Sequence, residues 1–164
     1  MTPAKQAEDS PNPYDHAMNL ALKFLGPRGR STVEVRDRLH RSQVPEATVE
    51  EVLGRLEELQ LLNDSELASD FADRARARGE SSSRIRSGLK SRGLSEEPGR
   101  VDSLPEAESA RALELAQSRA RALRSLPPQV AHRRLAAYLA RRGYGFEVVD
   151  KVCRIALSPQ DSDD

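Results

Sequence analysis

The sequence predicts an all-α protein built from three tandem three-helix repeats that stack into an elongated, curved array. Shifting the chain by 50 residues against itself aligns three helical segments without a gap. The aligned segments are Val35-Arg36 with Leu39, Ile85-Arg86 with Leu89, and Leu135-Ala136 with Leu139. A fixed period of this length is typical of small helical units that stack in tandem, each covering its neighbour's apolar face. No stretch alternates apolar and polar residues as a strand does, which favours helices throughout.

The first repeat is expected over residues 15–62, after a polar arm at residues 1–14 that has too little apolar surface to fold. Asp15 can cap a helix that ends at Gly26-Pro27, because proline cannot supply the next amide hydrogen. Ser31 and Glu34 have the spacing of a capping box and open a second helix. Pro45 starts a third. The inward-facing residues are expected to be Ala17, Met18, Ala21, Leu22, Leu25, Val35, Leu39, Val49, Val52, Leu53, Leu56 and Leu59.

The second repeat is expected over residues 63–105. Either Asp64 or Ser65 can cap its first helix, and Gly79 ends that helix. The serines at 81–83 cap the next helix, and Gly93 supplies the left-handed residue that turns the chain after it. A third helix is expected before Pro105, with only Val101 and Leu104 to anchor it. The other inward-facing residues are Leu67, Ala68, Phe71, Ala72, Ala75, Ile85 and Leu89.

The third repeat is expected over residues 106–157 and opens with a long helix at about 106–124, which Pro127-Pro128 breaks. Gly143 ends the helix that matches the 50-residue period. The inward-facing residues are Val130, Leu135, Tyr138, Leu139, Phe146, Val149, Val152, Ile155 and Ala156. Residues 158–164 form an acidic tail. The sequence therefore predicts nine helices in three groups of three.

The charges are unevenly distributed, although 26 basic and 26 acidic residues cancel over the whole chain. Residues 1–70 hold 8 Lys and Arg against 13 Asp and Glu, whereas residues 71–157 hold 18 against 10. The basic half could engage nucleic acid or an acidic protein surface. The alternative is that these charges only solvate helix faces.

The sequence contains no pattern of reactive groups that predicts an enzyme. The glycine-rich spacings that hold nucleotide phosphates are absent. His16, His40 and His132 lie on separate predicted helices without a second ligand three or four residues away, so we expect surface histidines, no metal and no cofactor. The single cysteine, Cys153, is spaced as a core residue, and the lack of a disulfide partner fits a reduced cytoplasm. No apolar run approaches the roughly 18 residues that cross a bilayer.

Arginine is concentrated on helices of the second and third repeats, and it outnumbers lysine 22 to 4 in the chain. Cations near the carboxyl end of a helix are stabilised by the helix dipole, which explains some of these positions. The planar guanidinium group also suits bidentate pairing with phosphate or carboxylate. The candidate contacts to a partner or to DNA are Arg74, Arg76, Arg78, Arg84, Arg86, Lys90, Arg92, Arg133, Arg134, Arg141 and Arg142.

A three-helix unit with a glycine turn could also be a helix-turn-helix that reads the major groove. The helix after Gly93 or Gly143 would then be the reading helix. That helix carries Glu96 and Glu97 in one copy and Glu147 in the other, and these carboxylates would repel phosphates. The basic residues lie on the middle helices instead, which suits backbone contact without sequence readout.

Short motifs in a fixed order resemble the RecX family of RecA regulators over about residues 15–157. The motifs are Ser31 with Val35, Arg36 and Leu39; Leu62-Asn63-Asp64 with Leu67-Ala68 and Phe71; Arg84-Ile85-Arg86 with Leu89 and Arg92-Gly93-Leu94; and Leu135 with Leu139 and Arg142-Gly143-Tyr144.

This resemblance implies a small bacterial cytoplasmic protein that binds in the groove of the filament that RecA recombinase forms on DNA. It implies inhibition of the RecA ATPase, of strand exchange and of filament growth, with effects on DNA repair, recombination and the SOS response. We expect a monomer whose partners are the RecA filament and the backbone of single- or double-stranded DNA, with no membrane involved. The alternative is a free-standing helical protein that binds the DNA backbone without depending on RecA.

Overall fold

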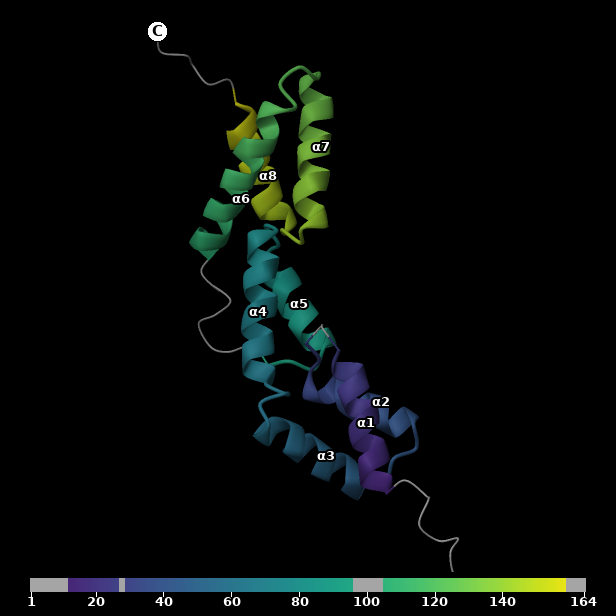
Figure 1. Ribbon diagram of the computed structural model, residues 1–164. Helices are drawn as coiled ribbons and strands as arrows, with labels where there is room; N and C mark the ends of the chain where they lie inside the picture. Colours follow the sequence, from purple (N-terminus) through teal and green to yellow (C-terminus); the bar gives the residue numbers. More distant parts are fainter. Residues whose placement is uncertain (1–11, 27–28, 96–104, 159–164) are drawn as a thin grey trace, which may run out of the picture. The chain divides into compact units, whose positions relative to one another are not determined.

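The computed structural model describes residues 12–26, 29–95 and 105–158, and all regular structure in these ranges is α-helical. The chain divides into two compact units. Unit 1 comprises residues 1–67 together with 92–95, and unit 2 comprises residues 68–91 and 96–164. The described ranges contain eight helices, labelled α1 to α8 in Figure 1. The predicted all-α class is confirmed. The ninth expected helix, with Val101 and Leu104, falls outside the described residues.

Unit 1 contains a bundle of three helices: α1 (Pro13–Leu25), α2 (Thr32–Arg41) and α3 (Glu46–Glu58). Its core consists of small and branched apolar side chains, as expected of a chain with few aromatic residues. The buried members are Ala17, Ala21, Val35, Leu39, Val49, Val52, Leu53, Leu56 and Leu62. The capping box at the start of α2 is confirmed, because Ser31 Oγ accepts a hydrogen bond from Glu34 N while Glu34 accepts one from Ser31 N.

Helix α1 begins three residues earlier than the sequence predicts. Its cap is Asn12, whose Oδ1 accepts a hydrogen bond from Tyr14 N, so the expected cap at Asp15 is wrong. Pro13 occupies the first helical position, where its fixed φ angle suits a helix and its missing N–H is not needed. Pro13 and Tyr14, which were expected to belong to the polar arm, are therefore part of α1.

Two further helices, α4 (Asp64–Ala77) and α5 (Ser82–Ser91), follow α3. The cap of α4 is Asn63, whose Oδ1 accepts from Glu66 N, rather than Asp64 or Ser65. Ser81 caps α5 as predicted, because its Oγ accepts from Arg84 N. The two helices approach closely where Phe71 lies against Gly88: a Cβ atom at Gly88 would lie 2.4 Å from Phe71 Cζ.

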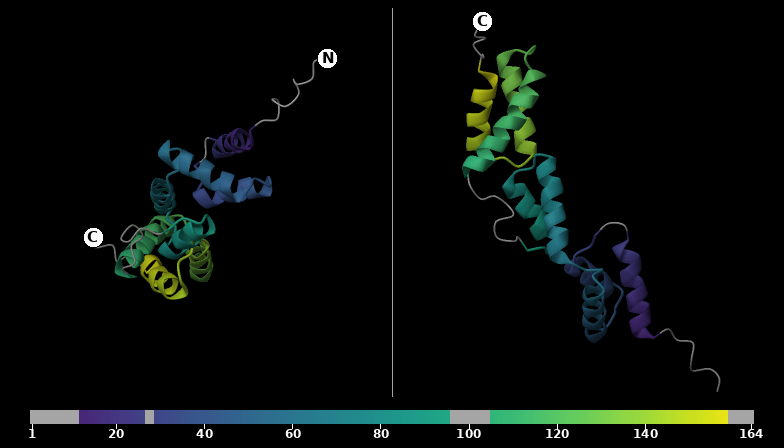
Figure 2. Two further views of the ribbon diagram at one scale, coloured as in Figure 1. Left: turned by 90° about the horizontal axis from the view of Figure 1, so that it is seen from below. Right: turned by 60° about the vertical axis from the view of Figure 1, so that its left-hand side comes forward.

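The rest of unit 2 is a second three-helix bundle of α6 (Pro105–Arg121), α7 (Pro128–Arg141) and α8 (Phe146–Leu157). These helices lie side by side in Figures 1 and 2. Their buried core is Ala112, Ala116, Ala120, Leu123, Ala131, Leu135, Leu139, Tyr144, Val149, Val152 and Cys153. Helix α6 ends at Arg121, three residues before the expected end, because turns carry the chain from there to Pro127.

Four residues that the helical period places inside are exposed. Phe146 is 84% exposed because it is the first residue of α8. Side chains of a helix tilt toward its amino end, so the Phe146 side chain points past the first turn that packs in the core. Leu59 follows the last residue of α3 as its cap. Leu22 and Ile155 lie at the edges of their apolar stripes, one and two residues after the buried Ala21 and Cys153.

Each of the three middle helices, α2, α5 and α7, is followed by a left-handed residue two positions after its last residue. Gly93 (φ +67°) and Gly143 (φ +89°) take this conformation as predicted. At the matching position of α2 the residue is Gln43, with φ +59° and an exposed side chain. The three turns are therefore alike in conformation, but only the second and third use glycine.

Candidate partner-binding surface

The arginines of α7 form a basic face on unit 2. Arg133, Arg134 and Arg141 are exposed and lie on the side of α7 opposite the buried Leu135 and Leu139. Among the described residues, these three arginines form no ion pair. Their guanidinium groups therefore remain available for an external phosphate or carboxylate. We call Arg133, Arg134 and Arg141 the α7 basic face.

The arginines at the end of α4 are paired with carboxylates of the chain itself. Arg74 contacts Asp70 at 2.8 Å, and Arg76 contacts Asp73 at the same distance. Arg78 contacts Glu80 at 2.8 Å, a carboxylate that Arg84 approaches at 3.7 Å. These pairs are exposed and weak individually, but they place a negative charge beside each cation and so reduce the local positive potential.

On α5, Arg86 is half-buried and Lys90 is exposed. The two residues are four positions apart and so lie on the same side of the helix. Within the described part of the chain, Lys90 forms no ion pair, so this residue can supplement the α7 basic face in the positive charge of unit 2.

Arg92 forms contacts that the sequence did not predict. Its Nη2 donates to Glu34 Oε2 at 2.8 Å and to the Gly29 carbonyl oxygen at 2.8 Å. The Arg92 carbonyl oxygen accepts a hydrogen bond of 2.6 Å from Ser31 Oγ. Gly93 lies against Val33, where a Cβ atom would come within 2.6 Å of Val33 Cγ2. Arg92 therefore holds the turn after α5 against the start of α2, entirely within unit 1.

A matching contact in unit 2 involves Arg142, the residue 50 positions later. The Arg142 carbonyl oxygen accepts from Ser81 N at 2.9 Å, and its Nε donates to the Arg78 carbonyl oxygen at 3.2 Å. Its guanidinium carbon lies 3.9 Å from the centre of the Tyr138 ring. A Cβ atom at Gly143 would come within 2.6 Å of Ser81 Oγ. We call these two arrangements the joint contacts.

Beside each joint contact, a carboxylate from another helix accepts a hydrogen bond from the first backbone N–H of the middle helix. Asp64 Oδ1 accepts from Thr32 N at 2.9 Å, and Glu108 Oε1 accepts from Ser82 N at 3.0 Å. Thr32 and Ser82 are 50 residues apart. The 50-residue period of the sequence could have indicated these contacts, because serine recurs at 31 and 81 and Arg-Gly recurs at 92–93 and 142–143.

Glu34, a carboxylate of the first joint contact, has a shifted pKa. Burial by itself would raise the pKa of Glu34. The hydrogen bonds from Arg92 and from Ser31 N, together with the positive charge of Arg92, lower it by more than burial raises it. The pKa of Glu34 therefore lies below its ordinary value. Glu34 stays ionised and keeps its pairing with Arg92 at neutral pH.

The acidic residues of unit 1 are also partly neutralised. Glu50 pairs with Arg36 at 2.6 Å and Glu58 with Arg55 at 2.9 Å. Glu46 Oε2 lies within hydrogen-bond distance, 2.7 Å, of His40 Nε2. All three histidines, His16, His40 and His132, are exposed, as the sequence predicted. In the described ranges, no three His, Cys, Asp or Glu residues are grouped so that they could hold a metal ion.

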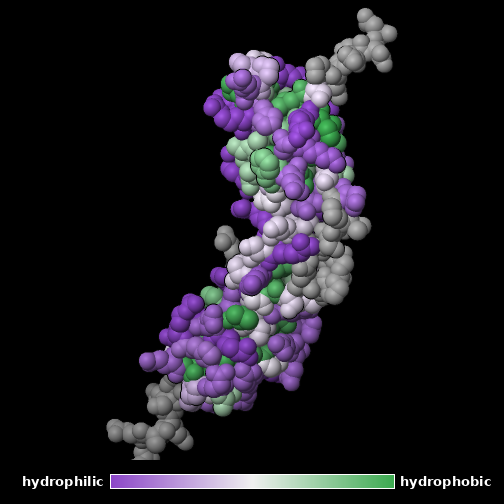
Figure 3. All heavy atoms as spheres, turned by 180° about the vertical axis from the view of Figure 1, so that it is seen from behind, coloured by the Kyte–Doolittle hydropathy of each residue, from purple (hydrophilic) through white to green (hydrophobic). Residues whose placement is uncertain are grey.

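The surface of the described residues has small apolar areas and no extended apolar sheet on the face that Figure 3 shows. None of the helices described has both the length and the apolar character needed to cross a membrane. The fold and the exposed arginines together define an all-helical repeat protein with charged helix faces.

Comparisons with known proteins place the chain in a family. Residues 17–56 match the first three-helix domain of RecX, and residues 106–153 match the third. The regulatory protein RecX of Thermobifida fusca is 32% identical over 151 residues, which cover 90% of this chain and 82% of the relative. That of Deinococcus radiodurans is 35% identical over 162 residues, covering 90% and 76%. The chain belongs to the RecX family of regulatory proteins.

Solved structures share this fold. The crystal structure of RecX from Lactobacillus salivarius matches with a TM-score of 0.64 and 17% identity, covering 88% of this chain and 96% of that one. A second crystal structure of regulatory protein RecX matches with a TM-score of 0.60 and 21% identity, covering 93% and 80%.

Proposed function

We propose that this protein is a negative regulator of the RecA recombinase in the bacterial cytoplasm. It binds the groove of the RecA–DNA filament and inhibits the RecA ATPase, strand exchange and filament growth, and thereby affects DNA repair, recombination and the SOS response. Membership of the RecX family of regulatory proteins is the observation that carries the proposal. It acts without a cofactor, because arrest of a filament needs binding and not catalysis. We further propose that it acts as a monomer.

The α7 basic face supports the contact part of the proposal. Arg133, Arg134 and Arg141 project from one rigid helix whose other side is fixed in the core by Leu135 and Leu139. A rigid row of guanidinium groups suits the regularly spaced phosphates of DNA, or carboxylates on a filament subunit. The other candidate arginines contribute less, because Arg74, Arg76 and Arg78 are paired locally and Arg92 and Arg142 form the joint contacts.

Tandem repeats also suit a helical filament as a partner. A filament offers the same surface on every subunit, and a protein made of similar units can engage more than one of these surfaces at once. Linked contacts of modest strength multiply through effective concentration. Three proposed repeats, at residues 15–62, 63–105 and 106–157, could act in this way.

The direct experiment is to titrate the purified protein into RecA ATPase reactions on single-stranded DNA. The test variant is R133E/R134E, which reverses two exposed charges and leaves the joint contact at Arg142 intact. The matched control is R38E/R41E on α2, which reverses two charges whose side chains make no ion pair in the described part of the chain. We expect inhibition by wild type and by R38E/R41E, and about tenfold weaker inhibition by R133E/R134E.

Absence of inhibition by wild type would refute the proposed function itself. Equal inhibition by both variants would refute only the assignment of the contact to α7. Circular dichroism of each variant checks that the helical content is unchanged.

A second candidate function is DNA-backbone binding that does not depend on RecA, favoured by the excess of basic residues over 71–157. It predicts binding to bare DNA at about 150 mM salt, with a log–log salt slope near 0.9 for each phosphate contacted. A protein that inhibits RecA but does not bind bare DNA under these conditions would exclude this second function.

A further inference from the structure

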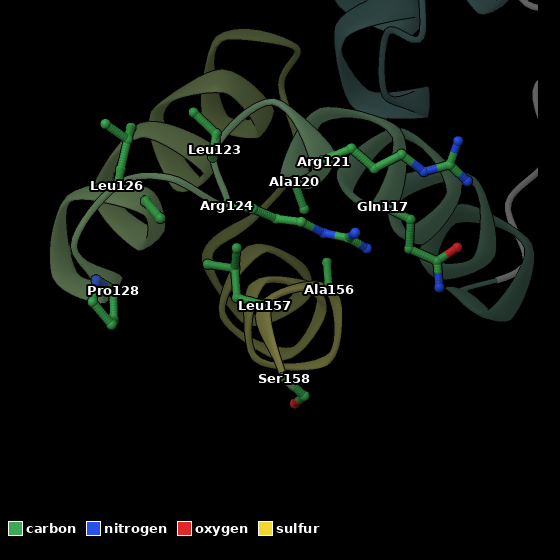
Figure 4. A pocket seen from close by; sticks show the side chains of 11 residues that line it. Gln117, Ala120, Arg121, Leu123, Arg124, Leu126, Pro128, Ala156, Leu157 and Ser158 are labelled. Carbon is green, nitrogen blue, oxygen red and sulfur yellow. The ribbon is translucent and has the colours of Figure 1, made fainter. Parts of the chain in front are cut away.

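A hollow of about 470 Å³ lies at one end of the α6–α8 bundle. One side is apolar, formed by Leu123, Leu126 and Leu157 with Ala131 and Ala156. Figure 4 shows the long side chain of Arg124 reaching across the middle of this hollow, with Arg121 and Gln117 at one side of it. A second, more open hollow shares Pro128, Leu157 and Ser158 with the first, so the concave surface continues past Leu157.

Among the residues that the structure describes, the two arginines of the hollow have no carboxylate partner. In the described ranges, neither Arg121 nor Arg124 forms an ion pair, and both residues are exposed. Most exposed arginines at the end of α4 are paired with a neighbouring carboxylate, as Arg74 is with Asp70. Two unpaired guanidinium groups beside an apolar floor form a surface that is complementary to carboxylates flanking an apolar side chain.

The position of the hollow relates it to the joint contacts. Residues 31, 81 and 131 are equivalent under the 50-residue period. Ser31 and Ser81 each hold the turn that follows the next middle helix, at Arg92 and Arg142. The third equivalent, Ala131, lines the hollow instead. The hollow is therefore the place on the last bundle that corresponds to an established docking position in the chain.

The chemistry of this position does not suit another helical repeat. Ala131 has no hydroxyl group to donate, and α7 begins one turn earlier, at Pro128, with no side-chain cap. If another repeat docked here as at the other two positions, Arg121 and Arg124 would face its basic Arg-Gly turn. The hollow combines an apolar floor and a concave shape with two cationic side chains.

We propose that this hollow binds an acidic peptide segment of a partner protein, with one large apolar side chain on Leu123, Leu126 and Leu157. Flanking carboxylates of the peptide pair with Arg121 and Arg124. The volume of the hollow accommodates one leucine or phenylalanine side chain together with part of the peptide backbone. The site is separate from the α7 basic face and does not depend on the RecA role.

The test uses the full chain and a fluorescein-labelled ten-residue peptide of Asp and Glu with a central Leu-Phe pair. Binding is followed by fluorescence anisotropy at about 150 mM salt. We expect R121E/R124E to bind the peptide at least about tenfold more weakly than wild type, and the charge-matched R38E/R41E control to bind as wild type does. A peptide with Ser-Ser in place of Leu-Phe should also bind about tenfold more weakly, because the apolar floor is then unused.

A second variant tests the floor without changing charge. Leu126 is only half-buried, so L126S should keep the fold and should weaken binding of the Leu-Phe peptide more than that of the Ser-Ser peptide. The carboxylates near the end of the chain have the same sign of charge as the peptide and should not attract it. The variant D161N/D163N/D164N should therefore bind the peptide no more weakly than wild type. Equal binding by R121E/R124E and wild type would overturn the proposal. Equal binding of the two peptides, or displacement of the peptide by an oligothymidylate, would also overturn it, because the site would then recognise charge alone.

Discussion

The hydroxyl group of Ser31 donates a hydrogen bond to the carbonyl oxygen of Arg92, 61 residues further along the chain. Ser81 and Arg142 have the same separation, and there the backbone amide of the serine is the donor. A serine that caps the middle helix therefore also fixes the turn after the next middle helix. Stability in each unit depends on a small set of polar atoms as well as on the apolar core.

Replacing Ser31 with alanine should destabilise unit 1. Ser31 is fully buried, and its Oγ both caps α2 and pairs the Arg92 carbonyl. Loss of a cap costs about 1 kcal/mol, and an unpaired carbonyl adds to this, so we expect a loss of about 1–2 kcal/mol in the free energy of unfolding. Urea denaturation followed by circular dichroism measures it. The matched control is S83A on an exposed position of α5, where a change above about 0.5 kcal/mol would contradict this explanation.

Replacing Gly93 with alanine should destabilise the protein for two reasons. The residue has φ +67°, and the new Cβ would lie 2.6–2.7 Å from atoms of Val33. Strain and overpacking together should cost about 2–4 kcal/mol. G54A on α3 is the control, because nothing lies within 4 Å of a Cβ there, and it should raise stability by about 0.5–1 kcal/mol. A G93A variant as stable as wild type would show that the turn does not need glycine.

The stability of unit 1 should depend on pH through Glu34. Because its folded pKa lies below the ordinary value of 4.5, the contribution of Glu34 is complete above pH 4.5 and is lost as the pH falls through the folded pKa. Denaturation midpoints between pH 7 and pH 3 should therefore fall less steeply for E34Q than for wild type. E51Q, a change at an exposed carboxylate of α3, should keep the wild-type slope. Parallel curves for wild type and E34Q would contradict the assignment.

Cys153 should be unreactive in the native protein. Its side chain is fully buried, and burial, with a smaller effect of the Asp150 charge, raises the pKa of its thiol. The thiolate is the reactive form, so labelling by a disulfide reagent at pH 8 should be slow until unit 2 unfolds. G143A, which forces a Cβ against Ser81 Oγ, should speed up labelling by destabilising unit 2. Labelling of the native protein at the rate of a free thiol would contradict the burial of Cys153.

Local signals in the sequence predicted most of the helices and several helix ends. The capping box at Ser31 and the glycine turns at 93 and 143 were read correctly, because each depends on the chemistry of a few neighbouring residues. Helix starts were less predictable where several residues could cap, as at Asn63, Asp64 and Ser65. Asp64 does not cap its own helix because its carboxylate instead accepts from Thr32 N, a contact between distant residues.

The roles of Arg92 and Arg142 could not be predicted from the helical period. Both resemble the other basic residues in sequence, yet their carbonyl and guanidinium groups are used within the fold, with partners far away in the chain. The pairs of Arg74 with Asp70 and of Arg76 with Asp73 do follow the helical period, because they join residues four and three positions apart. The hollow beside Arg121 and Arg124 depends on the packing of three helix ends and has no local sequence signature.

The left-handed residue in the turn after each middle helix shows whether a neighbour can cover that turn. At 93 and 143 a side chain would collide with Val33 or Ser81, whereas Gln43 adopts the same left-handed conformation with its side chain in solvent. A further repeat placed ahead of α1 could not dock on that turn in the same way unless position 43 became glycine. Relatives with longer or shorter chains can thus be compared by counting the glycines at this position, which gives the number of internal junctions before any coordinates are known.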